Sequence, residues 1–198
     1  MSVNKKLRNQ SSFRRALLIV ALLNLTYFLI EFFAAIRINS VSLFADSIDF
    51  LEDTFVNLLI FFSVLISLRI RAIISKILVI IILLPGLTAL WAAWEQIIRP
   101  YPPEAFELTL VGLGALLINC ICTIILMKFK NINESLIKAA FLSARNDVFS
   151  NCSIILAGLI IMIYPSIWPD LVAGIIIFTI NFDAAYKVYK ISDDEEKN

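Results

Sequence analysis

The chain has 198 residues, of which 60% are hydrophobic and only 17% are charged, and its net charge is +1. Soluble domains contain about 45–50% apolar and about 25% charged residues, so this composition excludes an ordinary soluble domain and a disordered chain. The near-neutral charge provides no general attraction for nucleic acid. We therefore expect an integral membrane protein built from long helices.

Six apolar stretches are long enough to cross a bilayer, whose hydrocarbon core of about 30 Å requires a helix of about 20 residues. Backbone groups in lipid must satisfy their hydrogen bonds internally, so these stretches predict helices. The fold expected is an all-α membrane protein, a six-transmembrane-helix bundle, in which Pro85 and Gly86 bend the third span. The predicted spans are residues 16–36, 41–68, 72–98, 105–127, 135–163 and 167–189.

Basic residues predict the orientation of the bundle, because the cytoplasmic loops of membrane proteins hold the excess of Lys and Arg. Nearly all of them lie in the N-terminal segment, in the loops after the second and fourth spans, and in the C-terminal tail. Only Arg37 and Arg99 fall on the opposite side. Both termini are therefore predicted to be cytoplasmic. The expected organisation is a cytoplasmic segment over 1–12, a transmembrane domain over 13–190 and a short acidic cytoplasmic tail over 191–198.

Acidic residues within the second span are the main functional signal. An ionisable side chain at membrane depth costs about 2.5–3.5 kcal/mol and therefore needs a cavity, a partner or an ion. Ser42, Asp46, Asp49, Asp53 and Asn57 fall on one stripe of the predicted helix. Asp49 and Asp53 lie one turn apart, so their two carboxylates can point at one divalent cation with oxygen ligands.

The fifth span repeats this pattern with Ser143, Asp147 and Asn151 at four-residue spacing. Neighbouring carboxylates in a low dielectric cannot all ionise unless a cation joins them. Metal ions and protons should therefore compete for the same oxygens, which is the chemistry of an exchanger.

Structural roles remain open for several of these groups. Asp46 lies near a span end, where a carboxylate can cap the helix or reach water. Glu31 of the first span can form an ion pair with Arg145 of the fifth, because a buried charge needs a partner. Asn57 and Asn151 are more often hydrogen-bond partners between helices than ligands.

The second span resembles that of the cation diffusion facilitator family of divalent-metal transporters. The family pattern is Ser-x-(Ala/Ser)-Leu-x-Ala-Asp-x-x-(His/Asp)-x-Leu-x-Asp. Further similarities follow in the family's order from residue 13 to 190. The matching residues are Ser40, Ser42, Leu43, Ala45, Asp46, Asp49, Leu51 and Asp53 in the second span, with Glu31, Arg99-Pro100 through Pro103, Asn119, Asp147 and Trp168-Pro169-Asp170 elsewhere.

The resemblance implies one metal site formed by Asp49, Asp53, Ser143 and Asp147. It also implies exchange of cytoplasmic metal for external protons by alternating access, with a homodimer as the expected assembly. The chain has no histidine, so proton coupling would run through the three aspartates. An oxygen-rich site favours Mn²⁺ or Fe²⁺, and Zn²⁺ remains open. Ser143 departs from the His or Asp usual in the family, and no C-terminal metal-binding domain is expected after residue 190.

The expected function is therefore divalent metal export (Zn, Mn or Fe class) by a multi-pass protein of the cell (inner) membrane, with metal ions and protons as substrates and no cofactor. Two alternatives remain. One is a non-transporting relative that acts as a partner or regulator, which Ser143 favours, and the other is transport of Mg²⁺ or another cation. Enzyme activity is not expected, because the sequence has no nucleophile–base pair, phosphate loop or cofactor motif.

Overall fold

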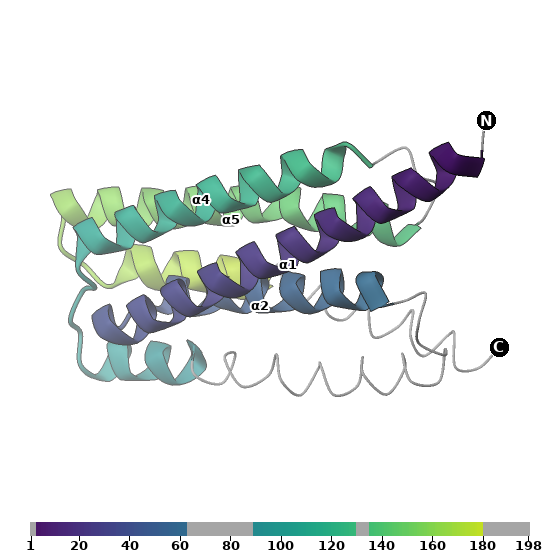
Figure 1. Cartoon of the computed structure of the whole chain (residues 1–198). Coiled ribbons are helices and arrows are strands. Elements are labelled where there is room, and N and C mark those ends of the chain that lie inside the picture. Colours follow the sequence, from purple (N-terminus) through teal and green to yellow (C-terminus); the bar gives the residue numbers. More distant parts are fainter. Residues whose placement is uncertain (1–2, 63–88, 130–134, 180–198) are drawn as a thin grey trace.

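The computed structural model describes residues 3–62, 89–129 and 135–179, with side chains described for 11–62, 89–129 and 147–179. Within these ranges all regular secondary structure is helical and forms six helices. Four are labelled in Figure 1, and two shorter ones cover 89–98 and 168–179. The labelled helices are α1 (Val3–Ile38), α2 (Val41–Phe62), α4 (Ala105–Met127) and α5 (Ser135–Ile163).

The helix limits agree with the sequence prediction at the start of α2 and over α4 and α5, whereas α1 runs from Val3 to Ile38 and begins 13 residues before the predicted first span over 16–36. α2 begins at Val41, and α4 and α5 cover the predicted 105–127 and 135–163. The expected bend at Pro85 and Gly86 lies outside the described residues, as does the predicted sixth span after residue 179. Apolar length thus predicted where these helices lie.

Two described helices, Ser11–Ile38 and Ala105–Met127, are long and apolar enough by themselves to cross a membrane. The part of α5 whose side chains are described, Asp147–Ile163, and the helix Trp168–Thr179 are also apolar, over shorter lengths. α2 is not in this group, because four acidic residues interrupt its apolar sequence: Asp46, Asp49, Glu52 and Asp53. Hydropathy alone therefore does not identify α2, the helix that carries most of the candidate site, as a membrane span.

The four labelled helices form a closed ring. α1 packs against α2 and α4, while α5 packs against the other sides of α2 and α4 (Figure 1). The connections 39–40, 99–104 and 164–167 all lie at one end of this ring, on the left in Figure 1. Residues from α1, α2 and α5 can therefore meet inside the ring, far apart in sequence but adjacent in space.

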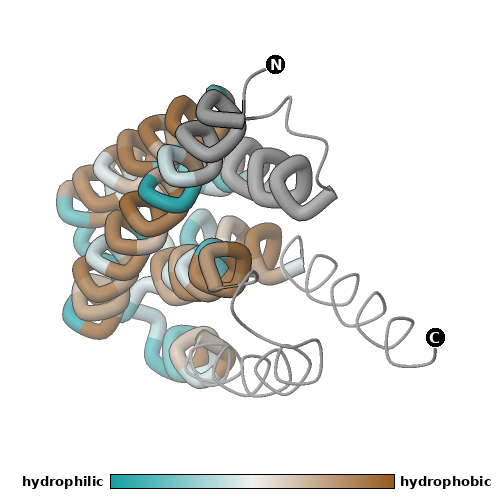
Figure 2. Tube along the Cα trace, turned by 45° about the vertical axis from the view of Figure 1, so that its right-hand side comes forward, coloured by the Kyte–Doolittle hydropathy of each residue, from teal (hydrophilic) through white to brown (hydrophobic). Residues whose placement is uncertain are grey.

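The distribution of polarity differs from that in a soluble protein, because wide apolar surfaces are exposed and several acidic and amide side chains are buried beside the hydrophobic core. Hydrophobic residues run along the whole length of the helices in Figure 2, and large ones such as Leu22, Phe33 and Leu117 are exposed. Charged and amide side chains, including Glu31 and Asp46, are fully buried. Soluble proteins seldom expose wide apolar surfaces or bury acids. This arrangement suits a surface that is covered by lipid.

Glycine allows helices of the bundle to approach closely. A Cβ atom at Gly174 would lie 2.7 Å from the Val41 Cγ1 atom and 3.1 Å from the Ser42 nitrogen. The helix over 168–179 can therefore lie directly against the first turn of α2. This contact brings Asp170, one turn before Gly174, to the N-terminus of α2.

Candidate cation site

The three aspartates expected at the site are buried on α2 and α5, two helices that pack against each other. Asp49 and Asp53 on α2 and Asp147 on α5 are at most 7% exposed. Asp53 and Asp147 are close enough for their charges to interact across the interface. Helical spacing places Asp49 and Asp53 on one face, and packing of α2 against α5 adds Asp147.

Ser143, the fourth expected ligand, lies in α5 one turn before Asp147, and its side chain is outside the described residues. Among the side chains that are described, no group of three or more acidic, histidine or cysteine residues is arranged to hold a metal ion. The ligand set of Asp49, Asp53, Ser143 and Asp147 therefore remains a prediction.

Asn24 of α1 supports Asp53 from the opposite side of α2. Its Nδ2 atom donates a hydrogen bond to Asp53 Oδ2 at 3.4 Å. Its Oδ1 atom accepts one from Cys122 Sγ on α4 at 3.5 Å. This chain orients the Asp53 carboxylate and links three helices. Asn24 is a polar residue within the first predicted span, whereas no sequence pattern indicates the role of Cys122.

Asn57 and Asn151 differ from the expectation that they join neighbouring helices. The Asn57 Nδ2 atom donates to the Asp53 backbone oxygen at 2.7 Å, and the Asn151 Nδ2 atom donates to the Asp147 backbone oxygen at 2.5 Å. In both residues the Oδ1 atom is buried and accepts no hydrogen bond from the described residues. Bonding back along the helix is favoured because the partner lies one turn away. Each amide side chain thus has an Oδ1 atom that accepts no hydrogen bond from the described residues and lies one turn after an aspartate of the site.

Asp46 does not cap α2 or reach water, and that alternative is wrong. Its side chain is fully buried, and neither carboxyl oxygen accepts a hydrogen bond from a described donor. It faces Glu31 of α1, which is equally buried. The Arg145 side chain lies outside the described residues, so the ion pair expected between Glu31 and Arg145 is not tested.

The cap on α2 comes instead from Asp170, which lies at the start of the helix over 168–179. Its carboxylate accepts hydrogen bonds from the Val41 and Ser42 backbone nitrogens at 2.8 and 3.2 Å. It also accepts from the hydroxyls of Ser40 and Ser42 at 2.7 and 2.5 Å, and from the Gln96 amide at 3.2 Å. A negative charge at a helix N-terminus satisfies unpaired backbone donors and is favoured by the helix dipole. Asp170 is thus fully used in holding the bundle together.

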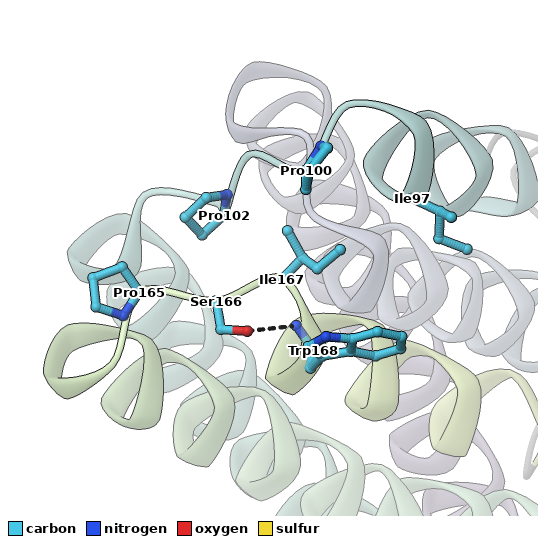
Figure 3. A pocket seen from close by; sticks show the side chains of 7 residues that line it. All are labelled: Ile97, Pro100, Pro102, Pro165, Ser166, Ile167 and Trp168. Atoms are coloured by element: carbon cyan, nitrogen blue, oxygen red, sulfur yellow. Dashed lines mark hydrogen bonds between the residues drawn. The ribbon is translucent and has the colours of Figure 1, made fainter.

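A hollow of about 400 Å³ lies at the same end of the bundle, between the loops around Pro100 and Pro165 (Figure 3). It contains no charged side chain, and its one hydroxyl, that of Ser166, accepts a hydrogen bond from the Trp168 backbone nitrogen at 3.4 Å. A cation has no suitable ligand there, so the carboxylates between the helices remain the better site. The lining residues are Ile97, Pro100, Pro102, Pro165, Ser166, Ile167 and Trp168.

Comparison with known families agrees with the carboxylate-lined bundle. No curated protein matches the chain. The family model described as the cation efflux transmembrane domain matches residues 17–192, which is most of the sequence. This match confirms the resemblance seen in the second-span motif. The chain therefore belongs to the cation efflux family, and its domain is that of a membrane-embedded cation transporter.

Proposed function

We propose that the protein exports a divalent metal ion in exchange for protons, with Asp49, Asp53, Ser143 and Asp147 as the cargo ligands. The observation that carries this proposal is the burial of three aspartates on two helices that pack together, α2 and α5, with Asp53 and Asp147 close enough to interact. Buried carboxylates in a membrane domain are expensive and mark ion pathways. Binding of a cation between two helices also depends on the distance between them, so a change in that distance changes the occupancy of the site.

The chemistry of the ligands suits Mn²⁺, Fe²⁺ or Zn²⁺ as cargo. Aspartate and serine offer only oxygen, which manganese and ferrous iron accept readily, and zinc binds wherever the geometry allows. The Oδ1 atoms of Asn57 and Asn151 add neutral oxygens beside the aspartates. The metal is the transported substrate, so the reaction requires no cofactor.

The exchange follows from competition between the metal ion and protons. Aspartate binds metal only when it is deprotonated, so metal binding releases protons and acidification releases metal. Because Asp53 and Asp147 lie on separate helices, metal binding favours their approach, and protonation removes that attraction. Alternating access would then proceed by movement of α2 relative to α5.

The proposal includes the wider architecture. The protein would cross the cell (inner) membrane six times with both termini in the cytoplasm, as the distribution of Lys and Arg indicates. Residues 13–190 would form the transmembrane domain. A homodimer would be held by faces within the membrane.

Metal uptake into proteoliposomes under an imposed pH gradient tests this function. Mn²⁺, Fe²⁺ and Zn²⁺ are compared for the wild type, for Asp53→Asn and for Glu95→Gln, which removes an exposed carboxylate. We expect Asp53→Asn to lower uptake at least about tenfold, the effect of losing about 1.4 kcal/mol of binding. Glu95→Gln should transport normally. Equal signals from the wild type, Asp53→Asn and empty liposomes would contradict the proposal.

A second candidate is a non-transporting family member that acts as a partner or regulator. Ser143 favours it, because a neutral hydroxyl is a weaker ligand than the His or Asp usual in the family. Replacing Ser143 with Asp separates the two possibilities. A silent wild type with an active Ser143→Asp variant would indicate a lost transport site, whereas an active wild type rules this candidate out.

A further inference from the structure

Glu31 on α1 and Asp46 on α2 form a second pair of buried acids beside the cargo site. Both side chains have no exposed surface. The two carboxyl groups are close enough to interact across the packed α1 and α2. All four oxygens lack a donor among the described residues. Two acceptors without a donor can bond to each other only when a proton lies between them.

Among the residues whose side chains are described, none near this pair neutralises it. Tyr27 of α1 is close, but its hydroxyl donates to the Val111 backbone oxygen of α4 at 2.5 Å. The other charged groups that act on the pair are Asp49 of α2, which acts on Glu31, and Asp147 of α5, on which Asp46 acts. These groups are acidic too. The ion pair seen among the described residues, Arg37 with Glu107, involves neither member. Two adjacent carboxylates in a low dielectric cannot both carry a charge without a cation.

We propose that Glu31 and Asp46 form a proton-binding site separate from the cargo ligands, in which the two carboxyl groups share one proton. The geometry favours a proton over a metal ion, because among the described side chains two carboxyl groups converge here and no group of three or more possible metal ligands is formed. Its place in the exchange cycle rests on the proposed function: the pair would release its proton toward one side of the membrane and regain it from the other. The shared proton itself does not depend on transport.

The position of the pair connects it to the cargo site. Asp46 precedes Asp49 by nearly one turn of α2, so a charge that appears on Asp46 repels the carboxylates of the cargo site and changes the affinity of that site for cations. A proton on the pair and a metal ion at the cargo site therefore influence each other. By linkage, the same coupling acts in both directions.

Infrared difference spectroscopy tests the shared proton without relying on transport. In metal-saturated protein the cargo aspartates are deprotonated, so the carbonyl stretch of a remaining buried carboxylic acid reports on this pair. We expect that band in the wild type and in Glu95→Gln, and its loss in both Glu31→Gln and Asp46→Asn. Each amide can donate a hydrogen bond to the carboxylate that remains, which preserves the fold. Absence of the band in the wild type, or its persistence in both variants, would overturn the proposal.

Proton and metal fluxes measured together in proteoliposomes test the role in exchange. We expect Glu31→Gln to keep its metal affinity within about twofold, because it retains all the cargo ligands and, beside an ionised Asp46, has the same net charge as the pair with its shared proton. It should release fewer protons per metal transported. A wild-type ratio of protons to metal in Glu31→Gln would overturn the role in the cycle. Failure of the wild type to transport any metal would instead contradict the proposed function, and the infrared result would still decide the shared proton.

Discussion

Two regions of α2, its N-terminus and the turn that contains Asp46, differ in the hydrogen bonds available to a buried carboxylate. At its N-terminus, Asp170 is fully buried and accepts five hydrogen bonds, three from side chains and two from backbone nitrogens. Less than two turns further along, Asp46 is equally buried and accepts none from the described residues. The two carboxylates are equally buried but differ in the hydrogen bonds that they accept. This difference distinguishes an acid that stabilises the fold from one that is available to bind protons or metal.

The physical cost explains why this distinction is informative. A buried carboxylate that has its donors can stabilise a protein, whereas one without them costs free energy that packing elsewhere must offset. Such groups persist where function needs them, as intramembrane acids usually show. Substitutions at the two regions should therefore change stability and activity in opposite directions.

The largest loss of stability is expected for Asp170→Ala. This change leaves the Val41 and Ser42 backbone nitrogens without their acceptor, removes one of the two acceptors of the Gln96 amide, and removes the charge at the N-terminus of α2. Each buried donor without a partner costs about 1–3 kcal/mol, so the total should be about 3 kcal/mol or more. Thermal unfolding in detergent, followed by the fraction that remains monodisperse, measures this effect. An unchanged unfolding midpoint would show that the cap is dispensable.

Asp147→Asn should lower transport without lowering stability. It removes a negative charge that Asp53 and Asp46 repel, so the unfolding midpoint should stay constant or rise in the absence of metal. Metal uptake should fall at least about tenfold, which corresponds to about 1.4 kcal/mol. The same detergent assay and proteoliposome uptake test both parts. A variant that unfolds early but transports normally would reverse the roles assigned to the two regions.

Gly174→Val should have an intermediate effect on the stabilising region. The new side chain would press on the Val41 Cγ1 atom and the Ser42 nitrogen, and so push Asp170 away from α2. Forced insertion of methyl groups into packed contacts costs about 1–3 kcal/mol. We expect a lower unfolding midpoint, with metal affinity changed less than in Asp147→Asn. Tolerance of valine would indicate that the helix over 168–179 can shift without losing the cap.

The smallest effect is expected for Glu107→Gln. Glu107 in the first turn of α4 pairs with Arg37 in the last turn of α1, whose side chain is 73% exposed. Exposed ion pairs contribute about 0–1 kcal/mol. Stability and uptake should both remain near wild type, which makes this variant a reference for the others. A loss as large as that of Asp170→Ala would show that surface pairs matter here as much as buried caps.

Local patterns explain what the sequence could predict. The limits of α4 and α5 follow from runs of apolar residues, and the shared face of Asp49 and Asp53 follows from four-residue spacing. The bond from Asn57 to its own helix was missed, because the same spacing also permits a partner on another helix.

Contacts between distant segments could not be predicted. Asp170 caps a helix that begins 129 residues earlier, and the sequence showed only an acid beside Pro169 at the start of a span. Glu31 and Asp46 meet because α1 and α2 form a tight antiparallel pair, and their relative rotation is set by packing rather than by composition. The difference in hydrogen bonding between Asp46 and Asp170 therefore becomes visible only in the folded structure.

Metal-dependent stabilisation tests the central claim most directly. A ligand that binds only the folded state raises its stability by about 2.7 kcal/mol at a concentration 100 times its dissociation constant. The unfolding midpoint of the wild type and Glu95→Gln should therefore rise as Mn²⁺ is added, and that of Asp53→Asn should not. Without metal, Asp53→Asn should be at least as stable as the wild type. An equal rise in Asp53→Asn would show that the carboxylates between α2 and α5 do not bind the cation.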